Sequence, residues 1–271
     1  MQGWAVRFFI LLFINLFTLS LMASDIVFGV VPQQSPSILI EKWTPVVNYL
    51  SKTTGLNVVL NIEKSIPEFE KNLNNGVYDI AYMNPHHYIV AKEKQGYMAL
   101  VRDSNMIVGI LVSRKDVTMD AIDFSKMKYL FPTPLAFAAT LLTKYEIDEK
   151  YGIDIDKNCS IKYVNSHDSV YKGVARGIGD IGGGIERTFN NMEDKETKDK
   201  LKIIYTTAPY PSHPIAFHPR LNKEEAKLLG DALFSIPANI LDELSMKKLI
   251  QIDDNEYNVI RKLSEKLDIQ E

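Results

Sequence analysis

Short apolar segments alternate with longer amphipathic segments along the first third of the chain. The apolar segments have the length and the β-branched content of buried strands, and they cover residues 26–31, 56–62 and 78–83. The segments that follow carry apolar side chains at helical spacing over residues 37–53, 67–76 and 85–96. Pro45 predicts that the first helix restarts there, with Thr44 as its N-cap. This alternation predicts an α/β fold in which mainly parallel sheets are flanked by helices.

The second half of the chain repeats this order of elements. Strands are predicted at 127–132, 159–164 and 179–185, and helices at 135–152 and 168–177. Both halves contain the pattern G-x-x-D-I-small, at 76–81 and 177–182, where a helix ends and a buried strand begins. Chance similarity between two such turns is the alternative explanation, although the order of elements around both copies also agrees.

Two long apolar stretches, 98–116 and 203–221, connect these halves, and the segment from Asn222 onward has helical spacing. We expect that segment to pack back on the first half. The chain would then form a discontinuous first lobe of residues 25–103 plus 214–271 and an inserted second lobe of residues 104–213. Two crossing strands would act as the hinge, and lobes of this kind close on a ligand by hinge motion.

The first 24 residues differ in composition from the rest of the chain. Arg7 precedes a largely apolar run from Phe8 to Met22, and the small residues Ala23 and Ser24 follow it. This order is typical of a secretory signal peptide, and the run is short for a membrane span, which needs ~20 residues. An uncleaved N-terminal anchor is the alternative. We expect export to the periplasm.

Composition excludes several classes of protein. The 271 residues carry a formal charge of −3, which provides no basic patch for nucleic acid. Cys159 is the single cysteine, so an intrachain disulfide is not possible. The literal G-x-G-x-x-G at 177–182 follows a helix and enters a strand, whereas a dinucleotide fingerprint does the reverse. No nucleophile motif or isolated carboxylate pair is recognisable, so the sequence predicts neither an enzyme nor a bound cofactor.

Polar residues gather at four predicted strand-to-helix junctions, at 32–37, 84–88, 133–139 and 165–169. In open α/β sheets, ligands bind beyond the carboxyl ends of the strands, where the N–H groups of helix starts favour an anion. We therefore predict a site for a small anion, with these contacts: Tyr82, Asn84, Tyr88, Thr133, Ala138, His167, Ser169 and Tyr210, with His213 at the hinge. Tyr82 is interpreted equally well as a core residue.

All five histidines lie at these junctions or on the returning stretch, namely His86, His87, His167, His213 and His218. Imidazole suits zinc, but adjacent helical residues such as His86 and His87 point about 100° apart, so they do not easily share one ion. No metal site is therefore predicted. His167 is expected to donate a hydrogen bond to an anion, and a loop histidine with satisfied hydrogen bonds is the alternative.

Five segments, taken in order, indicate a family: FGVVPQQSP, WTPVVNYLSKTTGLNV, NNGVYDIAYMNPHHYIVA, VNSHDSVYKGVARGIGDIGGG and YTTAPYPSHPIAFHP. Over residues 25–240 the chain resembles the periplasmic phosphate/phosphite/phosphonate-binding proteins, the PhnD-like receptors of ABC importers with a type II periplasmic-binding fold. The resemblance implies an oxyanion held between two lobes by helix-start amides, hydroxyls, an aromatic residue and often a histidine. By position, Tyr88 matches the tyrosine of the first-lobe motif, and His167 matches the histidine of the second.

The sequence departs from the family where many members carry a Ser-Thr-Ser run. Here the segment reads FPTPLAFAATLL, which keeps Thr133 and Thr140. The backbone N–H groups of Phe137, Ala138 and Ala139 are expected to bind the anion instead. The resemblance thus implies a monomeric solute receptor that passes a phosphonate-, phosphite- or phosphate-like anion to an ABC permease. Presentation of the ligand to a sensor histidine kinase and capture of zinc are the alternatives.

Overall fold

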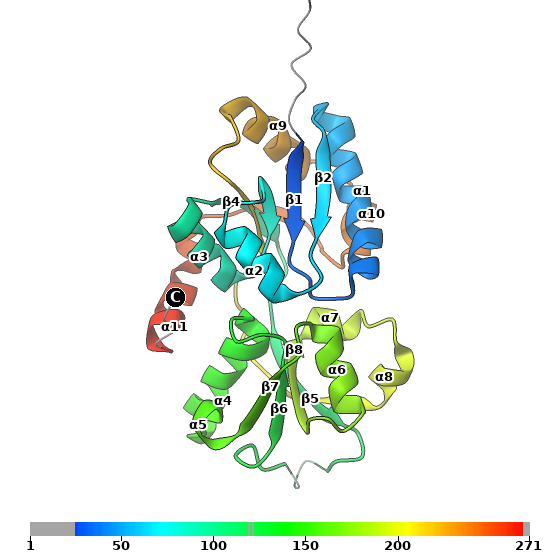
Figure 1. The fold of residues 1–271 in the computed structure, drawn as a ribbon, viewed down its shortest axis with the longest axis vertical. Helices are drawn as coiled ribbons and strands as arrows, with labels where there is room; N and C mark the ends of the chain where they lie inside the picture. Colours follow the sequence, from blue (N-terminus) through cyan, green and yellow to red (C-terminus); the bar gives the residue numbers. More distant parts are fainter. Residues whose placement is uncertain (1–24, 119, 121, 268–271) are drawn as a thin grey trace, which may run out of the picture.

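The computed structural model describes residues 25–118, 120 and 122–267. The predicted signal segment, residues 1–24, lies outside the described residues. Figure 1 shows two lobes, one above the other, each built around one sheet. Within the described part of the chain, every helix is too short or too polar to span a bilayer.

The first sheet has six strands in the order β11-β4-β10-β3-β1-β2. β1 pairs in parallel with β2 and β3, whereas β10 is antiparallel to β3 and β4, and β11 is antiparallel to β4. The strands are β1 (Ile26–Val30), β2 (Val58–Ile62), β3 (Ile80–Tyr82), β4 (Met98–Asp103), β10 (Pro214–Phe217) and β11 (Leu249–Gln251). The helices of this lobe are α1 (Pro36–Thr54), α2 (Ile66–Asn74), α3 (Pro85–Gln95), α9 (Lys223–Phe234), α10 (Ala238–Glu243) and α11 (Asn258–Lys266), with a 3-10 turn at Asp254–Tyr257.

The second sheet has five strands in the order β7-β6-β8-β5-β9. β6 is parallel to β7 and β8, whereas β5 is antiparallel to β8 and β9. Both sheets are mixed. Four strands of each sheet run in one direction, and β5, β10 and β11 run against their neighbours. The strands are β5 (Gly109–Arg114), β6 (Lys128–Phe131), β7 (Ser160–Tyr163), β8 (Ile181–Ile185) and β9 (Leu201–Thr206). The helices are α4 (Thr143–Tyr151), α5 (Ile155–Asn158), α6 (His167–Ala175), α7 (Glu186–Asn190) and α8 (Lys195–Asp199), preceded by a π-helix at Phe137–Leu142.

Helix α1 is continuous through Pro45, so the prediction of a restart at that residue is wrong. Thr44 does not cap a new helix, because its hydroxyl donates to the Ile40 carbonyl at 2.5 Å. The helix tolerates the proline because one face is anchored in the core by Leu39, Trp43, Val46, Val47 and Leu50. Packing of that face outweighs the loss of one backbone hydrogen bond.

Short polar side chains cap the helices that begin at the cleft. The Asn84 side chain accepts a hydrogen bond from the His87 backbone N–H at 2.8 Å, and Ser166 accepts from Ser169 N–H at 3.2 Å. Both caps turn the chain sharply out of an extended conformation, as expected for Asn and Ser. The predicted junctions at 84–88 and 165–169 are thus helix starts that face the gap between the sheets.

Several direct contacts join the two lobes. The backbone N–H of His167 donates to the Gln33 carbonyl at 3.2 Å, and the Ser35 N–H donates to Asp168 Oδ2 at 3.1 Å. At the far side, Lys266 of α11 forms an ion pair with Glu149 of α4 at 2.8 Å. The lobes therefore lie against each other on both sides of the cleft.

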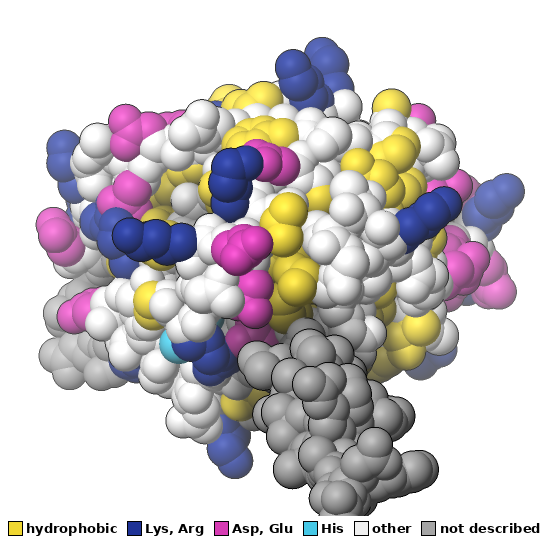
Figure 2. Space-filling model, turned by 90° about the horizontal axis from the view of Figure 1, so that it is seen from above, with side chains coloured by type: hydrophobic (Ala, Val, Ile, Leu, Met, Phe, Trp, Pro, Cys, Tyr) yellow, Lys and Arg dark blue, Asp and Glu magenta, His cyan; other side chains and the backbone are white. Residues whose placement is uncertain are grey.

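Figure 2 shows the molecule from above Figure 1, over the first lobe. Basic and acidic side chains are interspersed on this face, with apolar side chains between them. Such a mixture creates no extended field of one sign on this face.

Candidate functional site

A small cavity lies between the lobes at the start of the π-helix. Its volume is about 10 Å³, room for roughly one water molecule. It brings together four strand-to-helix junctions that are far apart in the sequence. The lining residues are Val31, Gln33, Ile66, Asn84, Ile107, Ala136, Phe137, Ala138, Ala139, His167, Ile185 and His213.

The start of the π-helix supplies backbone donors to this cavity. Within this turn, the Thr140 N–H is bonded to the Ala136 carbonyl at 2.8 Å. The N–H groups of Phe137, Ala138 and Ala139 precede it, and the first N–H groups of a helix have no acceptor within the helix. These three donors and the helix dipole favour a negative charge in the cavity.

The two threonines of this segment do not supply hydroxyl groups to the cavity in place of the absent Ser-Thr-Ser run. Thr140 Oγ1 donates to the Thr133 carbonyl at 2.8 Å, which ties the loop to the helix. Thr133 Oγ1 is buried and has no hydrogen-bond partner among the described residues. Thr133 borders the helix start without lining the cavity.

His213 presents a free donor at the same place. Its Nε2 atom lies 3.0 Å from the Gln33 side-chain nitrogen. An amide nitrogen only donates, so His213 Nε2 accepts and the ring proton lies on Nδ1. Nδ1 is buried and has no partner in the described part of the structure. A buried N–H without an acceptor is costly, and a ligand oxygen would satisfy it.

Burial keeps the histidines of the cleft neutral. Desolvation, and secondarily the charge of Arg187, lowers the pKa of His167 to about 3. The same two causes, in the same order, lower the pKa of His213 well below 6.5. Both rings therefore act as neutral hydrogen-bonding groups at physiological pH, and neither supplies a positive charge.

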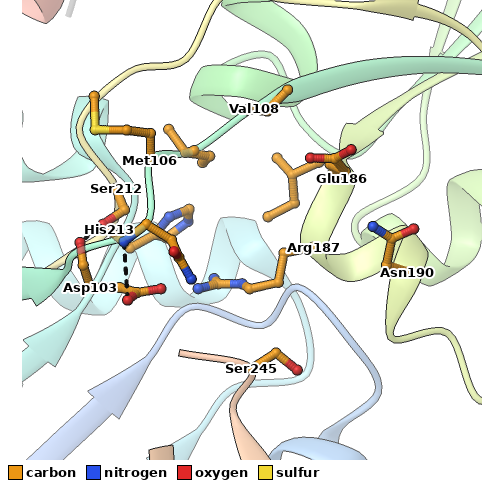
Figure 3. A pocket seen from close by; sticks show the side chains of 12 residues that line it. Asp103, Met106, Val108, Glu186, Arg187, Asn190, Ser212, His213 and Ser245 are labelled. Atoms are coloured by element: carbon orange, nitrogen blue, oxygen red, sulfur yellow. Dashed lines mark hydrogen bonds between the residues drawn. The ribbon is translucent and has the colours of Figure 1, made fainter. Parts of the chain in front are cut away.

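A larger cavity adjoins the first and shares Ile107, Ile185 and His213 with it. Its volume is about 340 Å³, and Figure 3 shows Arg187 reaching from its helix toward His213 and Asp103. Asp103 Oδ1 accepts the backbone N–H groups of Asn105 at 3.2 Å and Lys247 at 3.0 Å. The remaining lining residues are Met106, Val108, Glu186, Asn190, Ser212 and Ser245.

A family described as the periplasmic substrate-binding protein of the phosphonate ABC transporter matches residues 28–257. The chain belongs to this family. The predicted type II periplasmic-binding fold is confirmed, because solved structures of phosphonate-transporter binding proteins share the fold of this chain.

Three solved structures illustrate the similarity of fold. A binding protein component of a phosphonate ABC transporter from Pseudomonas aeruginosa has a TM-score of 0.81 at 19% identity, over 89% of this chain and 85% of that one. PhnD1 from Prochlorococcus marinus, in complex with methylphosphonate, has a TM-score of 0.81 at 15% identity, over 90% and 98%. The VFT2 domain of BvgS from Bordetella pertussis has a TM-score of 0.57 at 18% identity, over 82% and 92%.

The structure brings five of the predicted contacts of this phosphonate-family protein to the cleft. Asn84, Ala138, His167 and His213 line the small cavity. Tyr82 lines a third, narrow cavity of about 30 Å³ between α1 and α7. Its ring stacks on His213 and contacts Trp43, with centroids 5.2 Å and 4.7 Å apart. Both interpretations of Tyr82 therefore apply, because the ring belongs to the core and the hydroxyl faces the cleft.

Three predicted contacts lie elsewhere. The Tyr88 hydroxyl donates to Asp254 at 2.7 Å and accepts the Ala99 N–H at 3.3 Å, so it joins α3 to the C-terminal segment. Ser169 is exposed and bonds to Ser166 at 2.9 Å. The Tyr210 ring packs on Phe137, with centroids 5.7 Å apart. None of the three lines any of the cavities described above.

Sequence reasoning missed Arg187, the second residue of α7. Its guanidinium donates to the Tyr82 hydroxyl at 2.5 Å and lies 6.0 Å from the centre of that ring. The signal was available, because Glu186 and Arg187 follow the predicted strand 179–185 and form a fifth junction of the same kind.

Proposed function

We propose that this periplasmic binding protein captures a small phosphonate, or a related phosphorus oxyanion, between its lobes and delivers it to an ABC permease. The observation that carries the proposal is the meeting of free donors at one cavity that residues of both lobes line. Helix-start N–H groups come from the second lobe, and the Nδ1–H of His213 comes from the segment that returns to the first. The proposed contacts are Asn84, Ala138, His167 and His213, with Tyr82 beside them.

The strand membership of the sheets supports two lobes with the boundaries expected from the sequence. Strands of the first sheet fall within residues 26–103 and 214–251, and those of the second within 109–206. We take residues 25–103 plus 214–271 as one lobe and 104–213 as the other. The small cavity has room for roughly one water molecule, so we expect the lobes to separate for a phosphonate to enter.

Export to the periplasm is part of the same proposal. The family is periplasmic, and residues 1–24 have the composition of a signal peptide. The mature chain would act as a monomer, as the resemblance to solute receptors of this family implies.

Ligand screening by thermal shift and calorimetry tests the proposal. The probes are methylphosphonate, 2-aminoethylphosphonate, phosphite, phosphate, sulfate and zinc. A compound at 100 times its Kd should stabilise the protein by about 2.7 kcal/mol. Binding of at least one phosphorus compound is expected, and a response to zinc alone would contradict the proposal.

A pair of histidine variants locates the binding site. His213→Phe removes the free Nδ1–H donor and should weaken binding by about tenfold or more, the cost of one hydrogen bond to an ion. His218→Phe serves as the control, because His218 lies at the far end of β10 and outside the three cavities. Equal affinities in both variants would show that the ligand binds outside the small cavity.

The sensing alternative shares this cleft but not its partner. Delivery to a permease predicts that ligand-loaded protein stimulates the ATPase of the transporter in liposomes. Stimulation of histidine kinase autophosphorylation, without any effect on the ATPase, would favour sensing.

A further inference from the structure

The start of the π-helix lacks the hydroxyl side chains that many family members place there to meet a phosphorus oxyanion. Alanines stand at positions 136, 138 and 139 at the helix start, and the cleft histidines are neutral because they are buried. An oxyanion moved from water into such a site loses its hydration, and a positively charged donor compensates that loss more strongly than neutral donors do.

Among the described residues that line the two inner cavities, Arg187 is the one cationic side chain. Two carboxylates also line the larger cavity. Asp103 is held by backbone N–H groups, which compensate its charge, and Glu186 is exposed to solvent. Arg187 is therefore the available positive charge.

The guanidinium of Arg187 has a weak partner. Within the described part of the chain, no carboxylate oxygen lies within 4.0 Å of it, and its hydrogen-bond acceptor is the neutral Tyr82 hydroxyl. Hydrogen bonds between two charged groups are roughly twice as strong as those to a neutral group. A ligand oxyanion would therefore displace the phenol from the guanidinium.

Arg187 also lies close enough to the small cavity to act there. It lines the larger cavity beside His213, which lines both. The positive charge of Arg187 also acts on His167, because it contributes to the lowered pKa of both His167 and His213. An arginine side chain can turn from Tyr82 toward an anion at this shared wall without any movement of its helix.

We propose that Arg187 is the ligand-binding residue that neutralises the oxyanion, and that it exchanges the Tyr82 hydroxyl for a ligand oxygen on binding. This inference rests on the proposed function. An arginine from the second lobe would take over the role of the absent Ser-Thr-Ser run. The exchange leaves Tyr82 as a wall of the cleft, stacked on His213.

A simpler role for Arg187 is a latch, since the bond to Tyr82 joins the second lobe to the first. The two roles predict different results. If Arg187 only holds the lobes together, removing either partner has the same effect. If Arg187 binds the ligand, its loss is far more harmful than the loss of the Tyr82 hydroxyl.

Calorimetric titration of the mature chain with methylphosphonate, phosphite and inorganic phosphate separates these roles. Arg187→Gln should weaken binding a hundredfold or more, and Arg187→Lys, which retains the charge, about tenfold. Tyr82→Phe should change the affinity by less than threefold. Arg176→Gln is the matched control, because Arg176 is an exposed arginine of the same lobe and lies outside the cavities. Circular dichroism and melting curves establish that each variant is folded.

The outcomes are distinct. Equal losses in Arg187→Gln and Tyr82→Phe would overturn the ligand contact in favour of the latch. Wild-type affinity in Arg187→Gln would also overturn it, while leaving the proposed function intact. Failure of the wild-type chain to bind these three probes and 2-aminoethylphosphonate would overturn the proposed function and this inference together.

Discussion

Two glycines of the second sheet determine how closely the π-helix approaches it. A Cβ atom at Gly109 of β5 would overlap the Ala138 carbonyl oxygen, and one at Gly183 of β8 would overlap the Ala139 carbonyl oxygen. The helix start therefore rests directly on the backbone of two neighbouring strands. This close approach places the free N–H groups at the cleft.

We expect Gly183→Ala to destabilise the protein and to weaken ligand binding. The added methyl group meets backbone and the Phe131 ring, so the helix start must shift, at a cost of about 1–3 kcal/mol. Urea denaturation and calorimetry measure the two effects. Gly230→Ala in α9 is the control, because its Cβ would meet the end of the Leu100 side chain at 3.2 Å and alanine favours the helix. Equal stability of both variants would contradict this account.

Tyr88 is a second residue whose role depends on where its hydroxyl points. Phenylalanine at this position removes the hydrogen bonds to Asp254 and to the Ala99 N–H. We expect Tyr88→Phe to lower the free energy of unfolding by about 1–2 kcal/mol and to leave ligand affinity unchanged. A tenfold loss of affinity at unaltered stability would contradict this and show that Tyr88 contacts the ligand.

At the scale of elements, α1 shows that a proline need not end a helix that is well buried on one face. The Glu41 carbonyl loses its partner because Pro45 has no N–H. The buried side chains of α1 nevertheless keep its axis in place. The same proline lines an open surface groove beside Glu41 and Glu193.

Pro45→Ala should therefore stabilise the protein by about 1–3 kcal/mol, because alanine restores the hydrogen bond and suits a helix interior. Thermal and urea unfolding measure the change. Pro36→Ala provides the comparison, since Pro36 is the first residue of α1, where the N–H is not needed. A destabilised Pro45→Ala protein would show that the proline is required by its surroundings.

At the scale of the whole molecule, buried neutral histidines couple folding to pH. Burial lowers the pKa of His86 to about 4 and that of His167 to about 3. Unfolded histidine titrates near 6.5, so below that pH the unfolded chain binds more protons than the folded one. The contribution of these neutral histidines to stability is therefore fully present above pH 6.5 and is lost as the pH drops toward 4.

We expect the free energy of unfolding to fall between pH 7.5 and pH 5, by on the order of 2 kcal/mol for each such histidine, at 1.36 kcal/mol per pH unit. Urea denaturation at the two pH values measures the loss. His86→Asn removes one titrating group outside the cleft and should reduce the loss by that amount. Asp168 acts in the opposite sense nearer pH 4, because burial raises its pKa. Equal stability at both pH values would contradict the prediction.

The sequence by itself determined the order of elements, the family and most of the helix starts at the cleft. These features follow from local signals: hydrophobic periods of two and 3.6 residues, capping residues such as Asn84 and Ser166, and glycines at helix ends. The predicted strand at 78–83 and helix at 85–96 correspond to β3 and α3 for this reason.

Tertiary structure alone decided the partner of each side chain. Tyr88 bonds to Asp254, 166 residues away, and Arg187 bonds to Tyr82, 105 residues away. The mixed strand order and the continuity of α1 through Pro45 were decided in the same way. Periodicity reports which face of an element is buried, but the packing of distant elements determines what that face meets.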